Sequence, residues 1–351
     1  MAETLFITTT PGLEAMLLRE CAALGRAETV AGGVRLSGPP GIHRRANLLL
    51  RTANRVWIEI GRFASHGPAE LRRELAGFDT TAYLPRGGVP ELEVYARGGL
   101  SEKSLRSAAA GLRGHGTLRL RSEPGVVALS VDSSGELLHR RGYRQEGSRA
   151  PLRETLAAGL LALTNHLPEE PLWDPLCGSG TLAIEAALAS RRSPPGLHRA
   201  FAFENFPSYD ARAYAAERRE AEKLALPTIP APIWASDLNA GALGTARRNA
   251  GRAAVLEDLR LFRHDATRPI DGLPTGTMAI ANLPYGKRVG GDDDLPALYR
   301  ALVSALRRAG VARAAFLTAA PEAIQWLGLE RAEVHRVENG GLPCRLLVAR
   351  L

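Results

Sequence analysis

The sequence predicts an α/β protein in which a mostly parallel sheet follows smaller α+β units. Three observations predict this fold class. After about residue 151, apolar segments of strand length alternate with segments of helical apolar spacing, which is typical of a parallel sheet. A glycine-rich turn joins the first of these strands to a helix in "WDPLCGSGTLAIEAAL". Before residue 150, strands and helices mix less regularly, which indicates α+β architecture.

The N-terminal part begins with a predicted strand at Leu5–Thr9. Helical apolar spacing then runs from Pro11 to Leu24 and stops at Gly25. The next predicted elements are a strand at Gly33–Leu36, a helix at Ile42–Leu50, strands at Val56–Phe63 and Leu92–Ala96, a helix at Ser104–Leu112, and strands at Thr117–Arg121 and Val126–Val131. Turn residues and a basic cluster in "SSGELLHRRGYRQEGSRAP" then indicate a domain boundary near residues 147–151.

The C-terminal part supplies the strands of the predicted sheet. They are expected at Leu172-Trp173, Ile233–Ser236, Arg260–Arg263, Met278–Ala281 and Ala314–Thr318, with an antiparallel edge formed by Glu333–Val337 and Arg345–Leu351. Residues 191–232 form a long insertion between the first two of these strands. Its role is left open by the sequence.

Composition restricts the class of protein. The 351 residues are 45% hydrophobic, so the chain can bury a sizeable core and is not disordered. The N-terminus has no signal-peptide pattern, and no apolar run reaches membrane-spanning length. Three scattered cysteines make neither a disulfide framework nor a zinc cluster and suit a reducing compartment. We expect a cytoplasmic protein without a membrane partner.

The net charge of +8 lies mainly in the N-terminal part. Residues 1–150 hold 21 basic and 15 acidic residues, whereas residues 151–351 hold 24 and 22. A basic excess there favours a polyanionic partner. Only three of the 45 basic residues are lysine, so an overall preference for arginine codons is an alternative explanation.

The glycine-rich turn is a candidate cofactor loop. Gly178 and Gly180 permit a tight turn and a close approach of the backbone to a ligand, and the following helix offers free N–H groups. The same spacing also satisfies a dinucleotide-binding fingerprint, and a purely structural turn is a further alternative.

Two carboxylates follow later strands of the predicted sheet. Asp237 comes after "IWAS" and Asp265 after "RLFRH", each at the carboxyl end of a parallel strand, where open α/β sheets bind ligands. Asp237 could accept ribose hydroxyls and Asp265 an exocyclic adenine amine. A nicotinamide enzyme places its ribose acid about 20 residues after the loop, whereas 57 residues separate Gly180 from Asp237. Each aspartate could also simply cap a helix.

The segment "AIANLPYGKRV" ends the fourth strand beside the same crevice. Asn282 offers an amide carbonyl, and the carbonyl of Leu283 is expected to be free because Pro284 has no N–H and restricts the residue before it. Two such oxygens could hold the hydrogens of one amino group. Tyr285 could stack on a base. A structural turn after the strand is the alternative.

These stretches together resemble the THUMP-domain class I S-adenosylmethionine-dependent RNA methyltransferases that make N2-methylguanosine. "DPLCGSGTLAIEAAL" resembles their cofactor loop, "NLPYG" their Asn-Pro-Pro-Tyr motif, "SSGELLHRRGYR" and "APLRETLAAGLL" their interdomain junction, and "NGGLPCRLLVARL" their C-terminal hairpin. The resemblance covers nearly the whole chain. Leu283 replaces a proline that many relatives carry.

The resemblance implies three domains, a cofactor and a set of site residues. The domains would be a ferredoxin-like segment at 1–65, a THUMP RNA-binding domain at 66–147, and at 148–351 a Rossmann-like class I methyltransferase domain with a mostly parallel seven-stranded sheet. S-adenosylmethionine would be bound by Asp174, Pro175, Cys177, Gly178, Ser179, Gly180, Thr181, Asp237, Asp265, Ala266 and Asn282. The catalytic residues would be Asn282, Leu283, Pro284 and Tyr285, and the RNA-binding residues Arg140, Arg141, Arg144, Lys287 and Arg288.

The resemblance also implies a substrate. We expect an acceptor-stem guanosine at position six of tRNA in preference to a guanosine of 23S rRNA, a monomer, and no required metal. Methylation of DNA adenine or protein glutamine is an alternative, because both use similar motifs. Cytosine-C5 chemistry would need a cysteine nucleophile, and Cys344 lies in the terminal strand instead. A non-catalytic RNA-binding protein is an alternative from another class, and equilibrium binding of S-adenosylmethionine would separate it from an enzyme.

Overall fold

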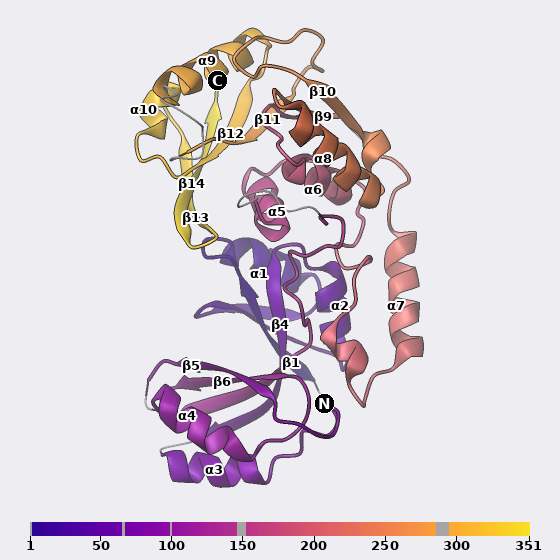
Figure 1. Cartoon of the computed structure of the whole chain (residues 1–351), viewed down its shortest axis with the longest axis vertical. Coiled ribbons are helices and arrows are strands. Elements are labelled where there is room, and N and C mark those ends of the chain that lie inside the picture. Colours follow the sequence, from indigo (N-terminus) through magenta and orange to yellow (C-terminus); the bar gives the residue numbers. More distant parts are fainter. Residues whose placement is uncertain (1, 65–66, 99, 146–151, 286–294) are drawn as a thin grey trace. The chain divides into compact units, whose positions relative to one another are not determined.

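The computed structural model describes residues 2–64, 67–98, 100–145, 152–285 and 295–351 (Figure 1). The chain divides into two compact units, and each is built from segments distant in the sequence. Unit 1 comprises Met1–Thr9, Leu17–Leu138 and Arg199–Glu220, and unit 2 comprises Thr10–Met16, His139–His198 and Ala221–Leu351. Within the described residues, no helix is long and apolar enough to cross a membrane.

Unit 1 is built on one seven-stranded sheet in the order β2-β3-β1-β4-β7-β6-β5. Its strands are β1 (Glu3–Thr9), β2 (Arg26–Val30), β3 (Gly33–Gly38), β4 (Ala53–Ala64), β5 (Glu91–Ala96), β6 (Thr117–Glu123) and β7 (Val126–Asp132). All neighbours are antiparallel except β5 and β6, which are parallel. The long strand β4 pairs with β1 on one side and β7 on the other, so the predicted ferredoxin-like and THUMP segments share this sheet.

The helices of unit 1 cover the apolar side of that sheet. They are α1 (Glu14–Ala22, which begins in unit 2), α2 (Ile42–Leu49), α3 (Pro68–Ala76), α4 (Glu102–Ala108) and the short η1 (Ala109–Gly111). Alternate strand residues such as Leu5, Ile7, Leu118 and Leu120 pack with these helices in one core. The alternation places the residues between them, such as Phe6 and Arg119, on the other side of the sheet, where the Arg119 guanidinium lies 4.9 Å from the centre of the Phe6 ring.

The insertion contributes to unit 1 as well. It contains η2 (Ala202–Asn205) and α7 (Ala211–Lys223). The rings of Phe201, Phe203, Phe206 and Tyr214 belong to the core of unit 1. Arg44 of α2 forms an ion pair with Glu217 of α7 at 2.7 Å. Residues 199–220 therefore complete unit 1, although in the sequence they lie between two strands of the sheet of unit 2.

Unit 2 contains the predicted parallel sheet, in the order β10-β9-β8-β11-β12-β14-β13. Its strands are β8 (Leu172–Asp174), β9 (Ile233–Asp237), β10 (Leu259–Arg263), β11 (Met278–Asn282), β12 (Arg313–Thr318), β13 (Glu333–Asn339) and β14 (Leu342–Arg350). The strands from β10 to β12 are parallel, and β14 and β13 form the antiparallel edge. The predicted strands and the fold class are confirmed.

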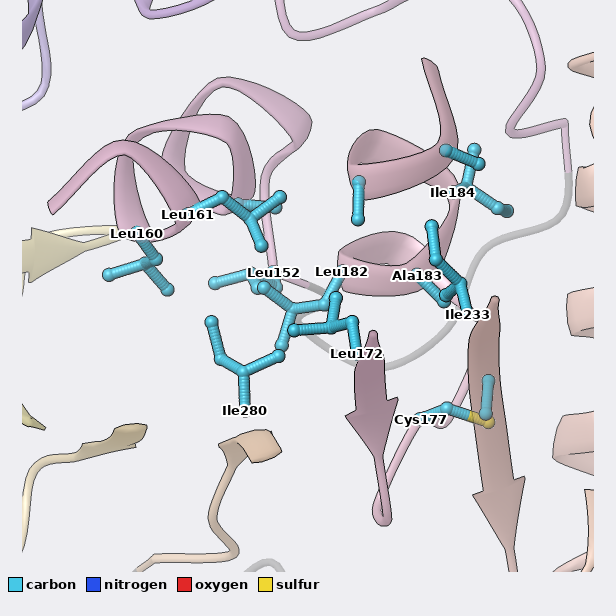
Figure 2. Close-up of a cluster of buried hydrophobic side chains, with 14 of the residues drawn as sticks. Leu152, Leu160, Leu161, Leu172, Cys177, Leu182, Ala183, Ile184, Ile233 and Ile280 are labelled. Carbon is cyan, nitrogen blue, oxygen red and sulfur yellow. The ribbon is translucent and has the colours of Figure 1, made fainter. Parts of the chain in front are cut away.

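The helices of unit 2 lie on both faces of this sheet. They are α5 (Glu154–Leu163), α6 (Thr181–Ser190), α8 (Ala240–Arg252), η3 (Leu256–Asp258), α9 (Leu295–Arg308) and α10 (Ala323–Leu327). Figure 2 shows the core on one face, where Leu160 of α5 and Leu182 of α6 lie over Leu172 and Ile280 of the strands. Tyr299 of α9 belongs to the core on the other face. Because both faces are covered, the central strands β11 and β12 are nearly continuous apolar runs.

Candidate cofactor and acceptor site

The glycine-rich loop connects the end of β8 to the start of α6. Gly178 and Gly180 have φ angles of 53° and 85°, in the left-handed region that favours glycine. A Cβ atom added to Gly180 would lie 3.1 Å from the Cβ of Ala246, so α8 leaves no room for a larger side chain. At Gly178 a Cβ would meet nothing within 4 Å, so the backbone faces open space there. This is the geometry that a closely approaching ligand needs.

Strand β9 and helix α8 hold the loop in place. The N–H of Cys177 donates to the Ser236 carbonyl at 2.9 Å, and the N–H of Gly178 donates to Oδ2 of Asp237 at 2.9 Å. The side-chain amide of Asn249 donates to the Ser179 carbonyl at 3.1 Å. Burial raises the pKa of the Cys177 thiol, which keeps it protonated and fits a packing role.

Asp237 is the last residue of β9 and keeps acceptor capacity after its contacts within the chain. Besides the bond from Gly178, its Oδ1 accepts the N–H of Asn239 at 2.8 Å. A carboxylate has about four acceptor positions, so ribose hydroxyls could still bind. Asn239, not Asp237, caps α8, because its side chain accepts from Gly241 and Ala242. The interpretation of Asp237 as a simple helix cap is therefore wrong.

Asp174 and Asp265 lie in different electrostatic environments. Asp174 ends β8 with 1% of its surface exposed, and this burial raises its pKa to about 8. The hydrogen bond that its Oδ1 accepts from the Leu176 N–H at 3.2 Å has the opposite, smaller effect on that pKa. Asp265 follows β10, and hydrogen bonds from the hydroxyl and the N–H of Thr267 lower its pKa. Asp265 is thus ionised at neutral pH, whereas burial favours the protonated form of Asp174.

The remaining predicted cofactor residues lie in or beside the same loop. Ser179 is partly exposed in the loop, while Pro175, Cys177, Thr181 and Ala266 are buried. Thr181 begins α6, and Ala266 follows Asp265 after β10. Because β8 pairs with β9 and β11, and β9 pairs with β10, the sheet gathers these strand ends at one edge.

Asn282 ends β11, the strand beside β8. Its Oδ1 is buried and has no hydrogen-bond partner among the residues that the structure describes. The N–H of Leu283 donates to the Leu317 carbonyl at 2.9 Å, which extends the pairing with β12 by one residue. A buried amide oxygen without a donor costs roughly 1–3 kcal/mol, so this atom is suited to a hydrogen bond from a bound group.

The turn after Asn282 is fixed by residues that the sequence did not single out. The hydroxyl of Tyr299, on α9, donates to the Pro284 carbonyl at 2.7 Å and lies 3.2 Å from Oγ1 of Thr318. The side-chain amide of Asn339 donates to the Tyr285 hydroxyl at 3.0 Å, and Tyr285 is 8% exposed. Asn339 precedes two glycines in "ENGG", which indicated a hairpin turn and gave no sign of this contact.

The predicted RNA-binding arginines differ in their environments. Arg140 is exposed. Arg141 is not placed for an RNA contact, because its side chain is 3% exposed and lies 3.6 Å from Glu185. Arg144 is engaged with Glu154 and Thr181 inside unit 2. Lys287 and Arg288 lie outside the described residues.

Comparison with known proteins decides the family. Residues 141–347 match the family model of the RMKL-like methyltransferase domain, and residues 4–57 match the RlmL ferredoxin-like domain. The chain belongs to the RMKL-like methyltransferase family. This family uses S-adenosylmethionine, and the open loop at Gly178 together with Asp237 and Asp265 fits that cofactor.

The RMKL-like chain is similar to two curated relatives over most of its length. It is 30% identical to slr0064 of Synechocystis sp., which is named as an RNA methyltransferase, over 97% of this chain and 95% of the relative. It is 32% identical to the ribosomal RNA large subunit methyltransferase K/L of Photobacterium profundum, over 96% of this chain. It covers 51% of that longer protein.

Two solved structures share the fold over nearly the whole chain. SMU.472, crystallised with S-adenosylhomocysteine (SAH), is 26% identical with a TM-score of 0.87 and coverage of 99% of this chain and 98% of that chain. A Listeria monocytogenes protein named as an N6-adenine-specific DNA methylase is 27% identical, also with a TM-score of 0.87, and covers 99% and 96%. Both likenesses span the two units.

Proposed function

We propose that this chain is an RNA methyltransferase that methylates the exocyclic N2 of a guanosine. The observation that carries the proposal is the buried Oδ1 of Asn282, which has no donor among the described residues. It lies at the end of β11, next to the strand whose end begins the cofactor loop. The amino group of a nucleobase is a donor that would satisfy it.

The cofactor supplies an electrophilic methyl group when it is bound. In our proposal, Asp237 accepts its ribose hydroxyls and Asp265 accepts its adenine amine. The pocket is completed by Asp174, Pro175, Cys177, Gly178, Ser179, Gly180, Thr181 and Ala266. Asn282 borders this pocket, and its side chain serves the acceptor base. The ionised state of Asp265 supports its role as an acceptor.

The residues of the acceptor turn act on the base by orientation. The lone pair of a guanine amino group is shared with the ring, so the nitrogen is a poor nucleophile. Asn282 Oδ1 and the Leu283 carbonyl each accept one N–H of that group, which directs the lone pair towards the methyl group. Pro284 shapes the turn, and Tyr285 packs against the base, a contact worth roughly 1–3 kcal/mol. The methylated nitrogen releases one of its two protons to solvent after the transfer, so no acid–base pair or covalent nucleophile is needed.

RNA as the acceptor is supported by charge and by the relatives' names. The basic excess of residues 1–150 suits a polyanion, and slr0064 and K/L are both named for RNA. We assign residues 1–65 to a ferredoxin-like segment and 66–147 to a THUMP module that holds the RNA. Arg140 contacts phosphate in this scheme. A base inside a duplex must also be flipped out, at a cost of a few kcal/mol, and binding by the N-terminal part offsets this cost.

Our first candidate for the methylated base is the guanosine at position six, in the acceptor stem of tRNA. The resemblance to THUMP enzymes favours it, because in such proteins that module docks the tRNA 3′ end. Guanosine of large-subunit rRNA is the second candidate, and the similarity to K/L favours it.

The test is transfer of labelled methyl groups to unmodified tRNA transcripts and to naked rRNA fragments, followed by mass spectrometry of the nucleosides. We expect N2-methylguanosine in tRNA. Labelling of rRNA alone would replace the first candidate by the second. N6-methyladenosine as the product would overturn the guanine assignment and would agree with the name of the Listeria protein.

A further inference from the structure

Arg141 and Arg144 of "HRRGYR" form a polar network with helix α6, most of it buried. Arg144 donates through Nη2 to the hydroxyl of Thr181, the first residue of α6, and to the Leu152 carbonyl at 2.9 Å. Its Nε lies 3.5 Å from Oε1 of Glu154, whose side chain is 3% exposed. Arg144 thus connects the first turn of α6 to the start of α5.

A second set of contacts holds the next turn of the same helix. The Tyr143 hydroxyl donates to Oε1 of Glu185 at 3.1 Å, and Nη2 of Arg141 lies 3.6 Å from Oε2. Glu185 is fully buried. It follows Thr181 by four residues, so the two side chains lie on one face of α6. Residues 141–144 therefore contact α6 at two successive turns.

Stability alone does not explain such a network. Well-packed apolar side chains of similar volume would give equal or greater stability than a buried ion pair, because taking both charges out of water is costly. The network instead fixes direction, because arginine donates in a rigid planar arrangement. The helix end that it fixes is the one at which the cofactor loop finishes, with Gly180 directly before Thr181.

We propose that Arg144 is a positioning residue for the cofactor site: through Thr181 it holds the start of α6, and with it the loop 177–180, in the form that binds S-adenosylmethionine. Glu154 orients the Arg144 guanidinium, and Arg141 with Tyr143 prevents α6 from rotating by holding Glu185. The proposal rests on the assignment of this loop to the cofactor made under "Proposed function". It also gives the basic cluster a second role, since Arg141 and Arg144 make contacts inside unit 2 while Arg140 is exposed.

Calorimetric titration of the full chain with SAH tests the proposal. Arg144→Met should weaken SAH binding at least tenfold while the variant remains folded by circular dichroism. Thr181→Val should weaken SAH binding to a similar degree. The double variant should bind SAH no more weakly than the weaker single variant, because both substitutions remove the same contact between Arg144 and Thr181. Arg144→Lys keeps the positive charge but not the rigid planar set of donors, so it should also weaken SAH binding. Arg140→Ala is the matched control and should bind SAH as the wild type does.

The outcomes distinguish a failure of the positioning role from a failure of the cofactor assignment on which it rests. If the wild type itself does not bind SAH, the cofactor assignment fails. If the wild type binds and Arg144→Met binds equally well, only the positioning role is overturned. If Arg144→Met does not fold, Arg144→Lys decides: wild-type SAH affinity in that variant would overturn the role. In turnover assays, we expect a raised KM for S-adenosylmethionine and an unchanged KM for RNA.

Discussion

The side-chain amide of Asn339 donates a hydrogen bond to the hydroxyl of Tyr285 at 3.0 Å. Two strands, β12 and β14, separate β11 from β13 in the sheet, and 54 residues separate the two partners in the sequence. The C-terminal hairpin thus fixes the orientation of the ring that ends the acceptor turn. Tyr285 is otherwise packed in the core of unit 2.

We predict that Tyr285→Phe and Asn339→Ala each lower kcat about two- to tenfold, the effect of losing one hydrogen bond of roughly 0.5–1.5 kcal/mol. The double variant should show no further loss, since both changes remove one interaction. Tyr285→Ala should abolish most methyl transfer. Steady-state kinetics under saturating RNA measures this, and strictly additive losses would show that the bond does not serve turnover.

Asn282→Ala should retain SAH affinity within about twofold and lose most methyl transfer. The reason is that its Oδ1 is the buried acceptor intended for the base. Calorimetry and single-turnover labelling are measured on one preparation. Near-normal turnover in this variant would show that Asn282 does not hold the amino group.

The sequence was most informative where local patterns carry the signal. Most strands from β8 to β14 were predicted because they contain apolar segments bounded by turn residues, whereas the polar strand β13 was predicted as the hairpin partner of β14. Strand β2 was missed because it is a polar edge strand that lies largely at the surface. Helix α3, with an arginine- and glutamate-rich face, and helix α7 in the insertion were also not predicted. The core that α7 joins is formed by residues far away in the sequence.

Side-chain partners were not predictable from the same patterns. The glycine loop, Asp237, Asp265 and Asn282 could be named because their types and positions at strand ends indicate ligand chemistry. Arg141 was predicted to bind RNA, because no residue near it in the sequence indicates its partner Glu185. Glu185 lies 44 residues later and is fully buried. A fragment beginning at Ala150 would therefore lose Arg141 and Arg144, so the full chain is required for binding tests.

Gly180→Trp should weaken SAH binding at least tenfold. Gly180 has a φ angle of 85°, and even a Cβ there would lie 3.1 Å from Ala246. Gly251→Ala in α8 is the matched control, because its Cβ would meet nothing within 4 Å. Calorimetry checks both variants, and unchanged affinity in Gly180→Trp would count against the loop as the cofactor site.

Asp174 should make folding stability depend on pH. Burial raises its pKa from 3.8 to about 8, so between these values the unfolded chain has lost a proton that the folded chain keeps. Its contribution to stability therefore falls as pH rises through this window and is constant above it. Asp174→Asn removes this term. Thermal unfolding from pH 5 to 8 should show the variant gaining stability relative to the wild type, and a constant difference would contradict the prediction.

Replacement of Arg140 should change RNA binding, whereas replacement of Arg141 should change the stability of the fold. Arg140 is exposed, so Arg140→Ala should weaken RNA binding and reduce the slope of log affinity against log salt by about one, the signature of one phosphate contact. Arg141→Met should leave that slope unchanged and lower thermal stability, because it strands the fully buried Glu185 carboxylate, a loss of about 3–5 kcal/mol. Fluorescence anisotropy with labelled tRNA at several salt concentrations, paired with thermal unfolding, measures both effects. If Arg140→Ala has the wild-type salt slope, Arg140 is a solvated charge, and the RNA contact must be sought elsewhere among the basic residues.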